Sequence, residues 1–304
     1  MRIGIDLGGT KTEAIALDAH GSVLARLRVA TVKGSYRDTI STIKDLVMKL
    51  EIDTGVEGTV GVGIPGTIVR ESGLVKNANS TWLNGKPLEG DLSHALGREV
   101  RCANDANCFA VSEATDGAAR GAGVVFGVIM GTGCGGGVAI KGSSYAGLNG
   151  LAGEWGHMPL PWMSQREFPG AECYCGRHGC IEGWISGPGL ENDFLGTTGI
   201  QRSGREIAQM AELGDAQAAA ALDRLEDRAA RGLAVVIGVV DPDVIVLGGG
   251  LSNIMRIYSG IERRLRDAVF GKNANTPVVQ ALHGDSSGVR GAAWLWPAED
   301  GLSL

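Results

Sequence analysis

Short apolar runs and longer amphipathic stretches alternate along the chain. Apolar runs bounded by glycine, proline or aspartate are typical of strands, and they predict strands at 2–6, 12–17, 23–29, 60–64, 100–103, 124–130, 138–140 and 243–247. Apolar side chains spaced three or four residues apart are typical of helices, and they predict helices at 37–51, 107–118, 204–212, 215–240, 252–269 and 289–296. This mixture predicts an α/β fold.

The second half of the chain repeats the opening arrangement. The first two strands are joined by a glycine turn, and the strands at 124–130 and 138–140 are joined in the same way. We interpret this as an internal duplication. The chain holds 49 glycines in 304 residues, far above the usual share of about 7%, and they cluster in turns between apolar runs.

Charge and cysteine content narrow the class of protein. The net charge of −6 and the lack of a long basic block argue against nucleic acid or an anionic membrane as the main partner. The chain opens on a strand rather than a signal segment, and its apolar runs are shorter than the roughly 20 residues that span a membrane, so we expect a cytoplasmic protein. Six cysteines in that compartment favour a metal site or core thiols over a disulfide framework.

Asn104 and Asp105 directly follow the short strand at 100–103 and precede a helix. In parallel α/β sheets, the carboxyl ends of strands present the reactive groups, so Asp105 is a candidate catalytic residue. An ordinary helix cap or turn is the alternative explanation for this pair.

Three glycine-rich loops are candidates for binding phosphate, because glycine lets backbone N–H groups approach phosphate oxygens. They contain Gly8, Gly9, Thr10 and Lys11; Gly131, Thr132 and Gly133; and Gly248, Gly249 and Gly250. The second loop also matches a dinucleotide-binding fingerprint, but it continues as a strand where the fingerprint requires a helix. Plain hairpin turns are the alternative. Together, the loops suffice for a nucleoside triphosphate.

A cysteine-rich segment predicts a metal site. Three cysteines and one histidine make a closed tetrahedral zinc set with no open position, so the metal would be structural; the proposed ligands are His157, Cys173, Cys175 and Cys180. The zinc would hold the segment that carries Glu154 and Glu182. His178 competes as a ligand, and spare thiols or a disulfide are the alternatives.

Six motifs, in this order and spacing, resemble the ROK family of bacterial sugar kinases nearly end to end; they are Asp6–Lys11, Gly63–Gly66, Asn104–Asn107, Gly131–Gly133, Glu154–His157 and Cys173–Glu182. Longer segments resemble the fructokinase, or mannofructokinase, branch; they are Val75–Asn84, Glu154–Trp162 and His283–Trp296. Met158 departs from that branch and is more similar to N-acetylglucosamine kinases.

The resemblance implies an actin-like (ribonuclease H-like) fold of duplicated α/β domains with a cleft between them. The small domain would comprise 1–117 plus 289–304, and the large domain 118–288 with the zinc loop. The family is commonly dimeric, so we expect a homodimer.

The resemblance also implies roles for individual residues. Asp105 would be the general base that accepts the proton of the sugar hydroxyl. ATP and Mg²⁺ would be held by Asp6, Gly8, Gly9, Thr10, Lys11, Gly131, Thr132, Gly133, Gly248, Gly249 and Gly250. The hexose would be bound by Gly66, Asn104, Asp105, Glu154, His157 and Glu182, with His157 using one ring nitrogen for zinc and the other for sugar.

The expected activity is therefore ATP-dependent phosphorylation of the 6-hydroxyl of D-fructose, with mannose as a second substrate. The alternatives within the family are a glucokinase and a kinase of N-acetylglucosamine or N-acetylmannosamine. Outside this class stand a sugar-sensing regulator that binds without phosphorylating and, less well supported, a dinucleotide oxidoreductase.

Overall fold

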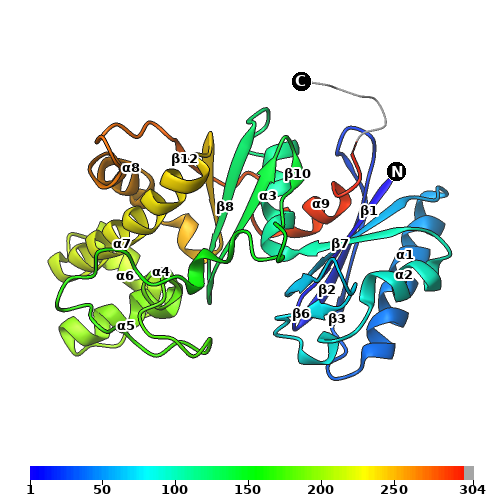
Figure 1. Ribbon diagram of the computed structural model, residues 1–304, viewed down its shortest axis with the longest axis horizontal. Coiled ribbons are helices and arrows are strands. Elements are labelled where there is room, and N and C mark those ends of the chain that lie inside the picture. Colours follow the sequence, from blue (N-terminus) through cyan, green and yellow to red (C-terminus); the bar gives the residue numbers. More distant parts are fainter. Residues whose placement is uncertain (298–304) are drawn as a thin grey trace. The chain divides into compact units, whose positions relative to one another are not determined.

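The computed structural model describes residues 1–297 (Figure 1). The chain forms two compact units. Unit 1 comprises Met1–Ala122, Gly137–Ala152 and the segment from Asp285 onward, and unit 2 comprises Gly123–Gly136 and Gly153–Gly284. The expected domains, 1–117 plus 289–304 and 118–288, stay a proposal. Within residues 1–297, no helix combines the length and apolar character needed to cross a bilayer.

Unit 1 is built on a five-stranded sheet with the order β3-β2-β1-β4-β7. Its strands are β1 (Arg2–Leu7), β2 (Lys11–Leu17), β3 (Val23–Ala30), β4 (Thr59–Ile64) and β7 (Val100–Asn104). The first three form the antiparallel meander that the sequence predicts, whereas β1, β4 and β7 are parallel. Pairing sets Asp6 beside Gly63 and Ile64 beside Asn104, so the carboxyl ends of the three parallel strands form one edge.

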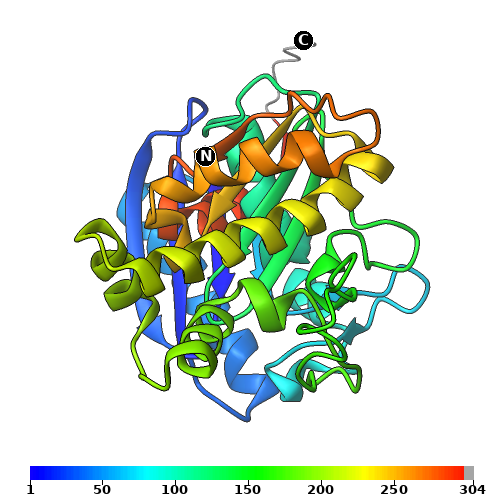
Figure 2. The same ribbon diagram turned by 90° about the vertical axis from the view of Figure 1, so that its left-hand side faces the viewer.

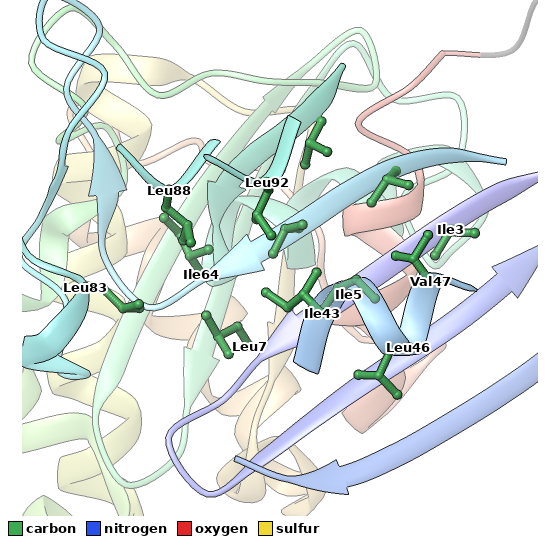
Figure 3. Packing of buried hydrophobic residues seen from close by; sticks show 14 of the residues in the cluster. Ile3, Ile5, Leu7, Ile43, Leu46, Val47, Ile64, Leu83, Leu88 and Leu92 are labelled. Carbon is green, nitrogen blue, oxygen red and sulfur yellow. The ribbon is translucent and has the colours of Figure 1, made fainter. Parts of the chain in front are cut away.

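One face of this sheet packs on α1 (Tyr36–Thr54) and α2 (Leu88–Leu96). Ile3 and Ile5 of β1 meet Ile43 and Val47 of α1 in a cluster from which water is excluded (Figure 3). Ser35 caps the start of α1, and Gly55 ends the helix in the left-handed conformation that glycine tolerates best. The sequence pattern predicts α1 but not α2.

The opposite face of the sheet is covered by α3 (Asp105–Thr115) and α9 (Ser287–Ala293). Side chains alternate between faces along a strand, so Gly4 and Asp6 point away from Ile3 and Ile5. A Cβ on Gly4 would lie 2.0 Å from the Val289 carbonyl oxygen, and glycine is therefore needed where α9 meets the sheet. The remaining elements of unit 1 are short: β5 (Thr67–Ile68), β6 (Val75–Lys76), η1 (Thr81–Leu83) and β10 (Ser143–Ser144). The turn η4 (Gly284–Ser286) spans the point where the chain passes from unit 2 back to unit 1.

The second sheet has the order β10-β9-β8-β11-β12, with β8 (Val124–Met130), β9 (Cys134–Ile140), β11 (Val244–Gly248) and β12 (Val278–Gln280). In unit 2, β8, β11 and β12 are parallel. The helices of unit 2 are η2 (Glu154–His157), α4 (Glu182–Ile185), α5 (Gly187–Thr198), α6 (Gly204–Glu212), α7 (Ala216–Val240), η3 (Gly250–Asn253) and α8 (Arg256–Ala268).

Helices α7 and α8 lie side by side (Figure 2). The fully buried Glu226 of α7 accepts hydrogen bonds from Arg256 and Arg264 of α8. Such a buried carboxylate must be paired to remain charged, so the two arginines tie these helices together. The predicted helix at 252–269 is in fact split into η3 and α8, and α9 ends before the predicted 296.

The close approach of α9 gives a stability prediction. A Cβ on Gly61 would lie 1.9 Å from the Ala292 carbonyl oxygen, so Gly61→Ala should lower the free energy of unfolding by about 3 kcal/mol or more. The matched control is Gly90→Ala in α2, where nothing lies within 4 Å of the added methyl group. Denaturant unfolding of both variants tests this; equal stability of the two would contradict the packing.

Candidate active site

Asp6 lies near the carboxyl end of β1, on the face covered by α9. A Cβ on Gly288 would lie 3.5 Å from its Oδ2, which shows how closely the start of α9 approaches the carboxylate. Burial, followed by the negative charges of Asp105 and Glu13, raises the pKa of Asp6 to about 6, against the opposing charge of Lys11. A cation bound here would offset that cost, and carboxylate oxygen suits Mg²⁺.

The first glycine loop is a tight hairpin between β1 and β2. The Gly8 amide donates to the Lys11 carbonyl oxygen at 3.1 Å, and a Cβ on Gly8 would lie 2.7 Å from the same oxygen. The Thr31 hydroxyl donates to the Gly8 carbonyl at 2.7 Å. Gly9, Thr10 and Lys11 are exposed at the tip, which is the arrangement that a phosphate loop requires.

Asn104 and Asp105 were each considered as a helix cap or as a reactive group, and the structure distinguishes them by their contacts. Asn104 is a helix cap: its Oδ1 accepts from the Ala106 amide at 2.9 Å, and its Nδ2 donates to the Gly66 carbonyl at 3.0 Å. Asp105 is the exposed first residue of α3, and its Oδ1 also accepts from the Ala106 amide, at 2.8 Å. Asp105 therefore lies at the carboxyl end of a parallel strand, where a reactive group is expected.

Gly66 is strained in a way that requires glycine. Its φ is +101°, and a Cβ would lie 2.5 Å from the Lys76 carbonyl oxygen. Its carbonyl oxygen accepts the hydrogen bond from the Asn104 side chain. Unit 1 thus brings together Asp6, Thr10, Lys11, Gly66, Asn104 and Asp105 at or near one sheet edge, and the charge of Asp105 acts on Asp6.

The second glycine loop joins β8 to β9 in unit 2. The Gly131 amide donates to the Gly133 carbonyl at 2.9 Å, and Thr132 is exposed. Glu182, the first residue of α4, accepts from the Cys134 amide at 2.9 Å, and a Cβ on Gly133 would lie 2.5 Å from the same Oε2. One oxygen of Glu182 therefore holds the loop.

The third glycine loop follows β11, the parallel neighbour of β8. Gly248 pairs with Ile129, and a Cβ on Gly249 would lie 2.6 Å from the Met130 carbonyl oxygen. The second and third loops consequently meet at the carboxyl edge of the unit 2 strands. That edge is where open α/β sheets bind ligands.

The short helix η2 carries Glu154 and His157 beside the start of β9. A Cβ on Gly156 would lie 2.0 Å from the Cys134 carbonyl oxygen, and the Trp155 indole donates to the Gly135 carbonyl at 3.2 Å. Trp155 is buried and meets Phe126 edge to face with ring centroids 5.6 Å apart. This packing leaves Glu154 exposed on a firmly held segment.

One donor atom from each of His157, Cys173, Cys175 and Cys180 lies within 4.8 Å of the others. The Cys175 and Cys180 Sγ atoms are 3.6 Å apart, and Cys173 Sγ is 3.6 Å from His157 Nδ1. These separations fit a tetrahedral zinc ion with Zn–S bonds of about 2.3 Å. In residues 1–297, His178 is not part of this group.

The other ring nitrogen of His157 has a neighbour within the protein. Its Nε2 lies 2.9 Å from the Tyr174 hydroxyl, which comes from the cysteine-rich loop itself. An outer hydrogen bond of this kind orients a metal-binding imidazole. The expected contact of this nitrogen with sugar stays a prediction.

Sequence reasoning missed an ionic cluster that holds the segment after His157. Glu167 accepts from Arg228 at 2.9 Å and from Arg231 at 2.7 Å, and Arg231 also donates to the Pro161 carbonyl at 2.9 Å. Burial raises the pKa of Glu167, but hydrogen bonds from the two arginines outweigh it and bring the pKa to about 2. The sequence signal for this cluster was limited to two arginines, Arg228 and Arg231, three residues apart on one predicted helix.

The low pKa of Glu167 predicts a pH-dependent contribution to stability. A carboxyl group whose pKa is lowered by folding stabilises the fold at pH values above its usual pKa of 4.5. This contribution is lost as the pH falls toward 2. Glu167→Gln should therefore melt several degrees below the parent at pH 7, and the gap should shrink below pH 4.5. Glu172→Gln, exposed on the same loop, is the control. A gap unchanged by pH would contradict the ionic role.

The metal assignment predicts a loss of zinc in Cys175→Ser. Metal analysis of the purified protein should find about one zinc per chain in the parent and well below one in the variant. The variant keeps only three of the four protein ligands and should therefore bind zinc more weakly. Cys102→Ala, which removes a thiol outside the cluster, should keep its zinc. Equal zinc in both variants would remove Cys175 from the ligand set.

A model of the ROK family matches residues 2–299. The N-acetyl-D-glucosamine kinase of Vibrio cholerae is 41% identical over 299 residues, which are 97% of this chain and 99% of that protein; the same-named protein of Pectobacterium atrosepticum is 40% identical, over 97% and 98%.

The crystal structure of a ROK hexokinase from Thermus thermophilus covers 97% of both chains at 30% identity with a TM-score of 0.84. This likeness confirms the expected actin-like α/β fold class. The relatives do not support the expected fructokinase branch, since they are N-acetyl-D-glucosamine kinases. Family model, relatives and fold agree, and the chain belongs to the ROK family.

Proposed function

We propose that this chain is an ATP-dependent sugar kinase that phosphorylates the 6-hydroxyl of N-acetyl-D-glucosamine. The observation that carries the reaction type is the exposed Asp105 carboxylate directly after β7, close enough to the partly buried Asp6 of β1 for its charge to act on it. The relatives at 40% and 41% identity support the substrate.

Asp105 would accept the proton of the sugar hydroxyl as that oxygen attacks the γ-phosphoryl group of ATP. Such transfers depend mainly on positioning and on neutralisation of charge, so the base need not be strong. Mg²⁺ would neutralise charge on the phosphates when bound, and Asp6 would hold it directly or through water. The exposed Thr10 and Lys11 would contact phosphate oxygens.

The glycine loops of unit 2 are also candidates for nucleotide binding. Gly131, Thr132 and Gly133 offer backbone N–H groups at the end of β8 for phosphate, and Gly248, Gly249 and Gly250 would face the adenosine at the end of β11. Zinc would be structural, because its four protein ligands leave no open position.

Sugar recognition would rest on carboxylates, each of which can accept two hydroxyl hydrogen bonds. Glu154 is the strongest candidate because it is exposed on the rigid η2 segment. Glu182 would bind sugar through the carboxylate oxygen that does not accept from the Cys134 amide. Asn104 would donate to sugar with the side-chain amide hydrogen that does not bond to the Gly66 carbonyl. Gly66 and His157 would shape the site, since the Gly66 carbonyl accepts from Asn104 and the His157 Nε2 lies 2.9 Å from the Tyr174 hydroxyl.

D-Fructose is a second candidate substrate, with mannose beside it. The segments Val75–Asn84, Glu154–Trp162 and His283–Trp296 resemble fructokinases, whereas Met158 resembles N-acetylglucosamine kinases. The homodimer implied by the family resemblance stays a prediction.

An ADP-release assay with Mg-ATP and a panel of fructose, mannose, glucose, N-acetylglucosamine and N-acetylmannosamine tests the proposal. N-Acetylglucosamine should give the highest kcat/KM. Asp105→Asn should lower kcat by about 10²–10⁴-fold with little change in KM, because only the transfer step uses the base.

Asp38→Asn, an exposed acid in the first turn of α1, is the matched control and should keep full activity. Near-normal turnover by Asp105→Asn would remove Asp105 as the base. A higher kcat/KM for fructose would move the protein to the second candidate, and ATP binding without turnover of any sugar would favour the regulator.

A further inference from the structure

The first turn of α3, which carries Asp105, is held by a side chain that the proposed chemistry does not use. Asn107 is a polar residue with only 4% of its surface exposed. Its Oδ1 accepts a hydrogen bond from the Val138 amide of β9 at 3.1 Å, in a buried environment. All three residues belong to unit 1.

The backbones of α3 and β9 also lie in close contact at Ala106 and Gly137. A Cβ on Gly137 would lie 2.1 Å from the Ala106 carbonyl oxygen, so glycine is required for the contact. The short strand β10 pairs with β9 only at Ala139 and Ile140. Asn107 therefore supplies the acceptor for the Val138 amide just beyond the reach of β10.

The first turn of a helix is where such a contact matters for geometry. Its N–H groups have no partners within the helix, so the turn frays unless it is capped or packed. Asn104 caps α3 from the strand before it, and Asn107 holds the same turn from β9. The direction of the Asp105 carboxylate depends on this turn, because Asp105 Oδ1 bonds to the Ala106 amide.

We propose that Asn107 is a positioning residue for phosphoryl transfer: its buried hydrogen bond to Val138 holds the first turn of α3 so that Asp105 points at the sugar hydroxyl. This rests on the proposed function of Asp105 as base. A displacement of about 1 Å in a reacting group can cost about 10²-fold in rate, so a side chain that holds this turn can control the rate without touching substrate.

Asn107→Ala removes the acceptor and leaves the Val138 amide buried without it. The variant should lose about 10- to 100-fold in kcat and in the single-turnover rate of phosphoryl transfer, with KM for sugar and ATP within about threefold of the parent. Ser112→Ala is the matched control. Ser112 is equally buried on α3, and its hydroxyl has no hydrogen-bond partner within the described residues, so its loss should leave kcat unchanged.

The double variant Asp105→Asn/Asn107→Ala separates positioning from a merely structural role. If Asn107 acts through Asp105, the double variant should be no slower than Asp105→Asn alone, because there is no base left to misplace. Rate losses that multiply in the double variant, or a normal rate per folded molecule in Asn107→Ala, would overturn the proposal.

Asn107→Ser keeps the test available if Asn107→Ala does not fold. Its hydroxyl is too short to reach Val138 but can bond to its own helix, so the same loss of kcat is expected. The two proposals fail separately. Full activity of Asp105→Asn would refute the base itself, whereas an inactive Asp105→Asn beside a fully active Asn107→Ala or Asn107→Ser would refute only the positioning role.

Discussion

The close contact of α9 with its neighbours is the constraint on which the rest of unit 1 depends. Glycine on both sides makes it possible: Gly4 of β1 and Gly61 of β4 admit the α9 backbone, and Gly291 of α9 admits the backbone of α3, where a Cβ would lie 1.6 Å from the Cys108 carbonyl oxygen. Any larger side chain at these points would separate the layers. The residue after the helix start, Gly288, then faces Asp6, so the last helix of the chain shapes the site formed by its first strand.

The carboxylates with little exposed surface fall into two groups, those paired with arginine and Asp6, and this difference points to the candidate site. Glu13 lies between Arg26 and Arg28, and Glu167 between Arg228 and Arg231, so both carboxylates are compensated by protein. Asp6 is partly buried near the carboxylates of Asp105 and Glu13, and its pKa rises to about 6. Structural carboxylates are normally paired, and a carboxylate held at such a cost is a functional candidate.

The sequence predicted those features whose signal is local. Asp105 follows an apolar strand directly, the glycine loops interrupt apolar runs, and the three cysteines grouped with His157 lie within eight positions, so period and spacing were enough to locate these segments. Contacts between distant segments gave no such signal. Glu167 and Arg228 are 61 positions apart, and nothing near Asn107 in the sequence indicates that its side chain reaches Val138. The occupation of His157 Nε2 by Tyr174 likewise follows only from the folded loop.

The central claim is that the chain transfers the γ-phosphoryl group of ATP to the 6-hydroxyl of N-acetyl-D-glucosamine. The most direct measurement is identification of the product of the wild-type protein with Mg-ATP and N-acetyl-D-glucosamine by phosphorus–proton correlation NMR. The account predicts a phosphate coupled to the two protons on C6. A phosphate coupled to the proton on C1, or inorganic phosphate as the sole product, would contradict it.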